Sequence, residues 1–177
     1  MIRSFTYWFA AVILLSAFSA GASVADSSQY GFTVKHVQVL KADPRVVFDK
    51  FTSDINKWWH PDHTWSGKAE NLYIQVYIGG VFGEKWESGS VRHMNVIYLE
   101  PGKVLRMEGG LGPMQQHAVT GVLTLEIAAD TSGTKVAMTY TAGGYMPGGM
   151  AKLAPLVDQV LGLQFSRFAA WVNEGKL

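Results

Sequence analysis

The order of two hydrophobic periodicities along the chain constrains its fold more than any other feature. Between residues 72 and 141 apolar side chains recur at every second position, which is typical of strands with one buried face. From Pro155 to Gly175 they recur at helical spacing instead, so we expect one long helix at the end of the chain. The expected turns in this region are Gly79-Gly80, Ser88-Gly89-Ser90, Pro101-Gly102 and Ser132-Gly133. These turns divide the region into about six consecutive strands.

The remaining elements precede the alternating region. Residues 32–40 predict a first strand, and Asp43-Pro44 favours the start of a short helix. Ser53 or Asp54 can cap a second short helix, which Pro61 ends. The expected later strands are 72–78, 81–87, 91–98, 103–108, 119–127 and 134–141, with a glycine-rich loop at 143–149. Consecutive antiparallel strands followed by a helix predict an α+β domain.

The first 25 residues have the three-part pattern of a secretory signal peptide. Arg3 supplies a positive start, residues 5–18 are apolar, and small residues lead to Ala25. The apolar run is shorter than the roughly 20 residues that a membrane-spanning helix needs. We therefore expect cleavage near Ala25 rather than an uncleaved anchor. Residues 26–177 would then form one exported, periplasmic domain with no membrane attachment.

Charge and composition exclude several classes of function. Of the 15 Lys and Arg residues, Arg3 lies in the leader, which leaves 14 against 14 Asp and Glu. A neutral domain favours no nucleic-acid partner. The chain has no cysteine, so disulfide and thiol chemistry are excluded. We also find no phosphate-binding Gly-Lys-Ser/Thr motif and no Gly-x-Ser-x-Gly nucleophile motif, so we expect no cofactor.

Half of the six tryptophans lie in the segment 58–67, together with His60, Asp62 and His63. We call this segment the Trp loop. A zinc site needs three or four converging ligands, and here a residue far along the sequence would have to complete the set. We therefore expect no metal, and interpret the histidines as structural partners or as groups at the rim of a pocket. The tryptophans are candidates for the pocket wall.

A second candidate is the hairpin that contains Glu84. If its turn centres on Gly89, Trp86 lies opposite Arg92 and Glu84 opposite Met94, so Glu84 and Arg92 are diagonal neighbours. A carboxylate on an apolar face needs a partner, or its pKa rises and it can act as an acid or polarise a ligand. The alternative is a solvent-exposed face on which the two charges simply pair.

The order of several motifs resembles the START/Bet v 1-like (SRPBCC) superfamily, especially the polyketide-cyclase/dehydrase-type and Aha1-type bacterial members. The resemblance implies a helix-grip fold, in which a curved antiparallel sheet of six to seven strands wraps around the C-terminal helix and encloses an apolar cavity. The segments that carry it are Val34-Lys35-His36, Ala42-Asp43-Pro44 with Val47-Phe48, Trp58-Trp59, residues 79–84, and the strand pair 121–125 and 134–140.

The resemblance implies a protein that binds a small hydrophobic or amphipathic molecule. Two alternatives stay open: a cofactor-independent cyclase, dehydratase or isomerase that uses Glu84 or a histidine for proton transfer, and a protein-interaction module built on the Trp loop. We favour the binding protein, because the chain has no nucleophile, metal or cofactor motif. The expected ligand-binding residues are Trp58, Trp59, Trp65, Phe82, Glu84, Trp86, Arg92, Met107, Met114, His117, Tyr140 and Met146, with Glu84 as the catalytic candidate.

Overall fold

The computed structural model describes residues 24–177. Most of the expected signal peptide lies outside these residues. In chain order the strands are β1 (Val24–Ser27), β2 (Gly31–Leu40), β3 (Leu72–Ile74), β4 (Val81–Trp86), β5 (Gly89–Glu100), β6 (Val104–Glu108), β7 (Ala118–Asp130) and β8 (Gly133–Tyr145). The helices are α1 (Pro44–Ser53), α2 (Ile55–Trp58) and α3 (Ala154–Glu174), and three short 3₁₀ turns are η1 (Pro61–His63), η2 (Ala69–Asn71) and η3 (Gly112–Gln116).

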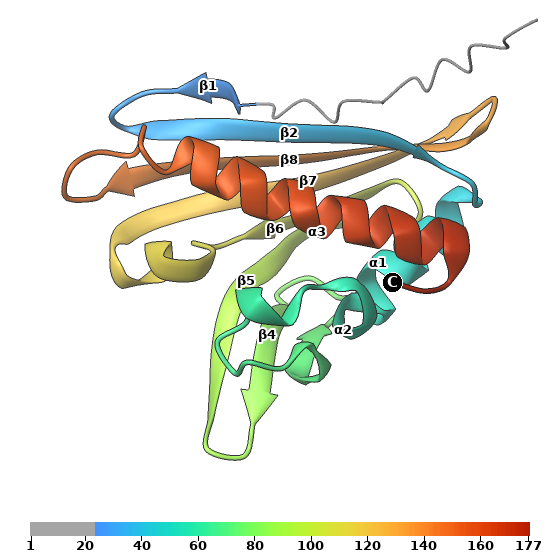
Figure 1. Ribbon diagram of the computed structural model, residues 1–177, viewed down its shortest axis with the longest axis horizontal. Coiled ribbons are helices and arrows are strands. Elements are labelled where there is room, and N and C mark those ends of the chain that lie inside the picture. The colour runs from blue at the N-terminus through green and yellow to red at the C-terminus, as the bar shows by residue number, and fades with distance from the viewer. Residues whose placement is uncertain (1–23) are drawn as a thin grey trace, which may run out of the picture.

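The strands form one antiparallel sheet in the order β1-β2-β8-β7-β6-β5-β4-β3. The sheet is strongly curved, and α3 lies across one of its faces (Figure 1). Helices α1 and α2 cover the end of the sheet near the C-terminal end of α3. The α+β arrangement expected from the sequence is therefore confirmed, with eight strands in place of six to seven.

The expected strand 72–78 was wrong in length, because β3 ends at Ile74. Beyond it the backbone turns back on itself: Tyr77 N donates to Gln75 O, and Gly80 N donates to Tyr77 O. The Gln75 side chain also accepts from Val81 N at 3.1 Å. These local hydrogen bonds compete with pairing to the next strand. The strand therefore ends at Ile74, although the alternation of apolar residues in the sequence continues to Ile78.

The glycine-rich segment also differs from the expected loop, because its first residues extend β8. Gly143 pairs with Thr120 and Gly144 with Val119 across β7, so the loop begins only after Tyr145. Gly144 has a φ of 139°, a backbone conformation that side chains rarely permit. The β7–β8 ladder can therefore run to the edge of the cavity described below.

Helix α3 packs its apolar stripe onto the sheet. Phe165 and Phe168 are buried, and Phe168 meets Phe51 and Trp58 with ring centroids 5.2 Å apart in both pairs. Burying a side chain of this size stabilises the fold by about 1.5–3 kcal/mol. This aromatic cluster fills the space under the C-terminal half of α3. Within residues 24–177, no helix is long and apolar enough to cross a bilayer.

Candidate ligand-binding site

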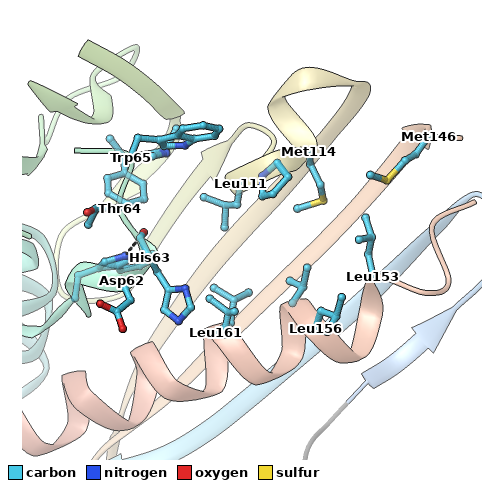
Figure 2. Close-up of a pocket in the computed structure, with 17 residues that line it drawn as sticks. Asp62, His63, Thr64, Trp65, Leu111, Met114, Met146, Leu153, Leu156 and Leu161 are labelled. Carbon is cyan, nitrogen blue, oxygen red and sulfur yellow. Dashed lines mark hydrogen bonds between the residues drawn. The ribbon is translucent and has the colours of Figure 1, made fainter. Parts of the chain in front are cut away.

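A cavity of about 450 Å³ lies under the N-terminal half of α3. Its volume is in the usual range for sites that hold a small organic molecule. Figure 2 shows Met114 facing Leu156 and Leu161 of α3 across this space, with the end of the Trp loop at one side. The lining residues are Trp59, Asp62, His63, Thr64, Trp65, Phe82, His93, Leu111, Gly112, Pro113, Met114, Met146, Leu153, Leu156, Val157, Val160 and Leu161.

The spacing of apolar residues along α3 explains its contribution to the cavity. Leu153, Leu156, Val157, Val160 and Leu161 recur at three- and four-residue intervals, which places them on one helix face. Leu156 is 59% exposed although it lines the cavity, so it marks the mouth. The floor and mouth on this side are therefore purely aliphatic.

The Trp loop is held in place by buried groups of other elements. His60 N donates to the Oε1 atom of Gln164 on α3 at 2.8 Å, and the indole N–H of Trp59 donates to His63 O at 2.9 Å. Trp65, 47% exposed, follows η1 at the rim. The loop thus presents one buried and one exposed indole to the cavity, as its composition suggested.

The register of the β4–β5 hairpin differs from the expected one. Its two-residue turn places Trp86 opposite Gly89 and Glu84 opposite Val91, so the expected opposition of Glu84 to Met94 was wrong. A shift by an odd number of residues moves Arg92 to the outer face, where it is exposed. Arg92 therefore does not pair with Glu84.

The same turn register brings His93 instead of Arg92 onto the face of Glu84, and a β-bulge lies at His93. Phe82 pairs with Met94 and the next residue, Gly83, pairs with Arg92, so His93 is the extra residue between them. The bulge lets His93 and Met94 both point inward, and both are buried. The His93 Nε2 atom lies 2.8 Å from Glu84 Oε1.

Glu84 is fully buried and its carboxylate accepts hydrogen bonds from three sides. Besides His93, Trp65 N donates to Oε1 at 2.9 Å and Ser66 N donates to Oε2 at 2.8 Å. Burial is the largest single influence and raises the pKa of Glu84, but the hydrogen bonds from Ser66, Trp65 and His93 together outweigh it. The net pKa is below its usual value. An ionised carboxylate therefore ties the Trp loop to β4.

Burial lowers the pKa of His93, and the neighbouring Glu84 carboxylate only partly compensates for this effect. At neutral pH the ring is neutral, with its proton on Nε2 facing Glu84, so that Nδ1 is an acceptor. The side-chain nitrogen of Gln115 on η3 lies 3.4 Å from this Nδ1 atom and donates to Arg92 O at 3.0 Å. His93 therefore connects the Trp loop, through Glu84, to η3.

His93 also lines a second, polar hollow of about 310 Å³. We call it the polar cleft; besides His93 it is lined by Arg92, Glu108, Gly109, Gly110, Gln115, Val119 and Thr120. Met114 and Leu111, which line the apolar cavity, belong to the same segment as Gln115. The two hollows thus share His93 in their walls.

Among the expected ligand-binding residues, Trp59, Trp65, Phe82, Met114 and Met146 line the cavity. The structure places the others outside its wall. Trp58 and Met107 are core residues, and Glu84 lies behind His93 and the backbone of Trp65 and Ser66. Trp86 lies at the hairpin tip, where its indole donates to Ser88 Oγ, and His117 and the exposed Arg92 also lie outside the cavity.

Tyr140, another expected ligand-binding residue, instead fixes the segment that leads to η3. Its buried hydroxyl donates to Gly109 O at 3.0 Å and accepts from Leu111 N at 3.2 Å. Burial raises the pKa of Tyr140 to about 12, with the Leu111 hydrogen bond acting in the opposite direction. Tyr140 therefore acts on the cavity through the backbone beside it.

Neither His93 nor the cavity face of α3 was among the site residues expected from the sequence. The face of His93 depends on the register of the β4–β5 turn, so His93 could be recognised only as a polar neighbour that a buried Glu84 requires. The α3 residues were recognised as an apolar stripe. Their division into a core half and a cavity half depends on the aromatic residues of α1 and α2 that fill one end.

The histidines of the Trp loop have local roles. Nδ1 of His60 accepts from Asp62 N at 3.2 Å and caps η1, and the rings of His60 and His63 lie 5.9 Å apart. Across residues 24–177, no three His, Cys, Asp or Glu side chains converge as a metal site would require.

No protein-family model matches the chain, and no curated protein is similar to it in sequence. Solved structures are similar in shape. The Mll3558 protein of Rhizobium loti aligns with a TM-score of 0.59 and 16% identity over 79% of this chain and 96% of its own. The Aha1 dimer of Colwellia psychrerythraea gives 0.53 and 12%, over 82% and 98%. CalU16 of Micromonospora echinospora gives 0.55 and 12%, over 83% and 77%.

The chain has the helix-grip fold. The expected helix-grip architecture is thus confirmed by both the sheet order and these neighbours. In total, 228 chains of solved structures are significantly similar in shape to this one, so the fold is shared widely. Identities this low establish the fold alone, and the function has to be argued from the cavity.

Proposed function

We propose that this protein binds a small, largely apolar molecule in the cavity between the sheet and α3. The observation that carries the proposal is the cavity itself: about 450 Å³, bounded by aliphatic and aromatic side chains from α3, the Trp loop, β4 and η3. Each CH₂ group that a ligand buries there contributes about 0.8 kcal/mol. Affinity should therefore rise along a homologous series of alkyl ligands until the cavity is full.

The polar groups lie at one side of the cavity. Asp62, His63 and Thr64 reach it from the Trp loop, where Asp62 and His63 are exposed. An amphipathic ligand would place its polar end there and its apolar end against Leu153 and Met146, at the opposite side of the cavity (Figure 2). This arrangement supports an amphipathic ligand as well as a purely apolar one.

The proton-transfer alternative has one feature in its favour, the buried Glu84–His93 pair. However, the Glu84 carboxylate accepts from Trp65, Ser66 and His93, and both ring nitrogens of His93 face protein atoms. A general base needs a free lone pair within reach of the substrate. The interaction-module alternative is weaker too, because Trp58 and Trp59 are buried. Binding is the function that this geometry supports best.

A pair of α3 variants tests the proposal. Val157→Phe fills the cavity, whereas Leu163→Phe adds the same ring on the exposed side of the same helix. We expect Val157→Phe to weaken binding of the neutral fluorescent probe N-phenyl-1-naphthylamine by at least roughly tenfold, or about 1.4 kcal/mol. Leu163→Phe should bind as the unsubstituted protein does. Equal probe affinity in both variants, with no apolar molecule co-purifying in native mass spectrometry, would refute the proposal.

We further propose that the domain functions after export to the periplasm. The support is the signal-peptide pattern of residues 1–25. Cleavage after Ala25 would leave Asp26 and Ser27 paired with Thr33 and Phe32 in β1. The intact mass of protein recovered from the periplasmic fraction checks this, since it should correspond to a chain that begins at Asp26.

A further inference from the structure

His93 holds a position that the proposed binding function does not require. It is the extra residue of a β-bulge, it is 7% exposed, and it lies in the wall shared by the apolar cavity and the polar cleft. Through Glu84 it connects to Trp65 and Ser66, and through Gln115 it connects to η3. Both of the segments that it connects supply lining residues of the cavity.

The Gln115 amide can make both of its contacts only when His93 is neutral. Its NH₂ group donates to Arg92 O at 3.0 Å and lies 3.4 Å from Nδ1 of His93, so both neighbours must be acceptors. When Nδ1 carries a proton, an N–H group faces the NH₂ group. Rotating the amide would bring its oxygen toward Nδ1 but also against the Arg92 carbonyl oxygen. Neither orientation then satisfies both contacts.

The loss of this contact acts on the cavity wall. Gln115 belongs to the short turn η3, whose Met114 lines the cavity and whose approach is fixed by Tyr140 at Leu111. A five-residue 3₁₀ turn has little internal stability, so its position depends on such side-chain contacts. The hydrogen bond between His93 Nε2 and Glu84 would be kept, since a protonated imidazole still donates to the carboxylate.

Protons can reach His93 from the polar cleft, where Nδ1 and Gln115 lie. The titratable groups around the ring are Glu84 in direct contact, Asp62 and His63 in the cavity, and Arg92 and Glu108 in the polar cleft. The pKa of His93 lies below its usual value because burial disfavours the charged ring. The ring is therefore neutral at pH 7 and takes up its proton only at a pH lower than an ordinary histidine would need.

We propose that protonation of His93 releases the η3 wall of the cavity, so that the protein holds its ligand at neutral pH and releases it as the pH falls. This inference rests on the proposed binding function. If only the neutral form binds, the apparent Kd doubles at the pKa of His93 and rises by about tenfold for each pH unit below it.

The test follows His93, η3 and the ligand separately between pH 7.5 and 4.5. The His93 ring is followed by NMR, backbone exchange at 112–116 by hydrogen–deuterium exchange corrected for intrinsic rates, and affinity with N-phenyl-1-naphthylamine. We expect exchange at 112–116 to increase and affinity to fall with the same midpoint as the His93 titration. A ring that stays neutral to pH 4.5, or an η3 whose exchange ignores the His93 titration, would overturn the inference.

Variants separate His93 from the other titrating groups. Gln115→Met keeps the length of the side chain but removes the amide, so affinity should be lower at neutral pH and its pH dependence should be lost. His63→Gln should keep the ratio between the probe affinities at pH 7.5 and at pH 4.5. His117→Gln changes a residue beside η3 but outside the cavity, so its probe affinity should equal that of the unsubstituted protein at every pH. An unchanged pH ratio in Gln115→Met would refute the role of η3. Absence of probe binding at every pH would instead refute the proposed function, while the exchange measurement still decides whether η3 responds to His93.

Discussion

Replacing Glu84 by Gln should destabilise the protein far more than the loss of one surface charge. The carboxylate accepts from Trp65 N and His93 Nε2 at Oε1, and from Ser66 N at Oε2. A glutamine oxygen can replace only one of these two acceptors. If it takes the Oε1 position, its NH₂ group faces the Ser66 N–H, and one buried donor is left without an acceptor.

The size of the effect follows from these three contacts. An unsatisfied buried donor costs about 1–3 kcal/mol, and each of the two remaining hydrogen bonds loses about 1 kcal/mol when its acceptor is no longer charged. We therefore expect Glu84→Gln to lower the free energy of unfolding by about 3–5 kcal/mol. For a domain of this size that corresponds to a melting temperature lower by roughly 6–20 °C.

Urea unfolding followed by tryptophan fluorescence measures this difference, and Glu70→Gln is the matched control because Glu70 is exposed. The pH dependence gives a second check. The folded pKa of Glu84 is lowered, so its stabilisation is complete above the ordinary glutamate pKa and is lost as the pH falls through the folded value. The gap between the two proteins should therefore narrow below about pH 4.5. A loss under about 1 kcal/mol at pH 7 would show that Glu84 does not anchor the Trp loop.

Three further predictions concern the walls of the cavity. Tyr140→Phe leaves Gly109 O and Leu111 N without their partner and should cost about 1–3 kcal/mol in urea unfolding. Because the folded pKa of Tyr140 is raised to about 12, the unsubstituted protein should lose stability from pH 10 toward 12, and Tyr140→Phe should lose less in an alkaline titration. Gly121→Ala places a methyl group against the hydroxyl and two ring carbons of Tyr140, so it should lower the melting temperature in calorimetry, and Tyr140→Phe, which keeps the ring, should not relieve this effect. Trp65→Ala removes an exposed wall of the cavity, so it should weaken probe binding with less than about 1 kcal/mol of change in stability.

The architecture could be predicted because it depends on patterns that extend over many residues. The alternation of Leu123, Leu125 and Ile127 and the helical stripe of α3 both survive in the structure. Each reflects one buried face repeated along an element, and tertiary contacts reinforce it. The 72–78 segment shows the limit, since its apolar alternation continues to Ile78 but the strand ends at Ile74, and Val76 and Ile78 are exposed.

The candidate site depends on the contacts of single residues, and fewer of these could be predicted from the sequence. The sequence left open whether Glu84 faces the pocket or the solvent and offered Arg92 as its partner, whereas Glu84 is buried and its partner is His93. The register of the β4–β5 turn decides between them, because Glu84 lies opposite Val91 and His93 therefore shares its face. The Trp loop was placed at the cavity by composition, yet which of its indoles is core and which is rim depends on packing against α3 and β4.

The irregular pairing of β5 separates two parts of the sheet that should differ in mechanical properties. The β7–β8 ladder keeps its register from Ala118–Tyr145 to Asp130–Gly133, whereas β5 is irregular against both β4 and β6. Amide protons in β7 and β8 should therefore exchange only through global unfolding, and those around the irregular pairs of β5 through local opening. A molecule entering the cavity would need motion in the irregular part alone. Ligand exchange and global stability could then be changed independently by substitutions on opposite sides of the same sheet.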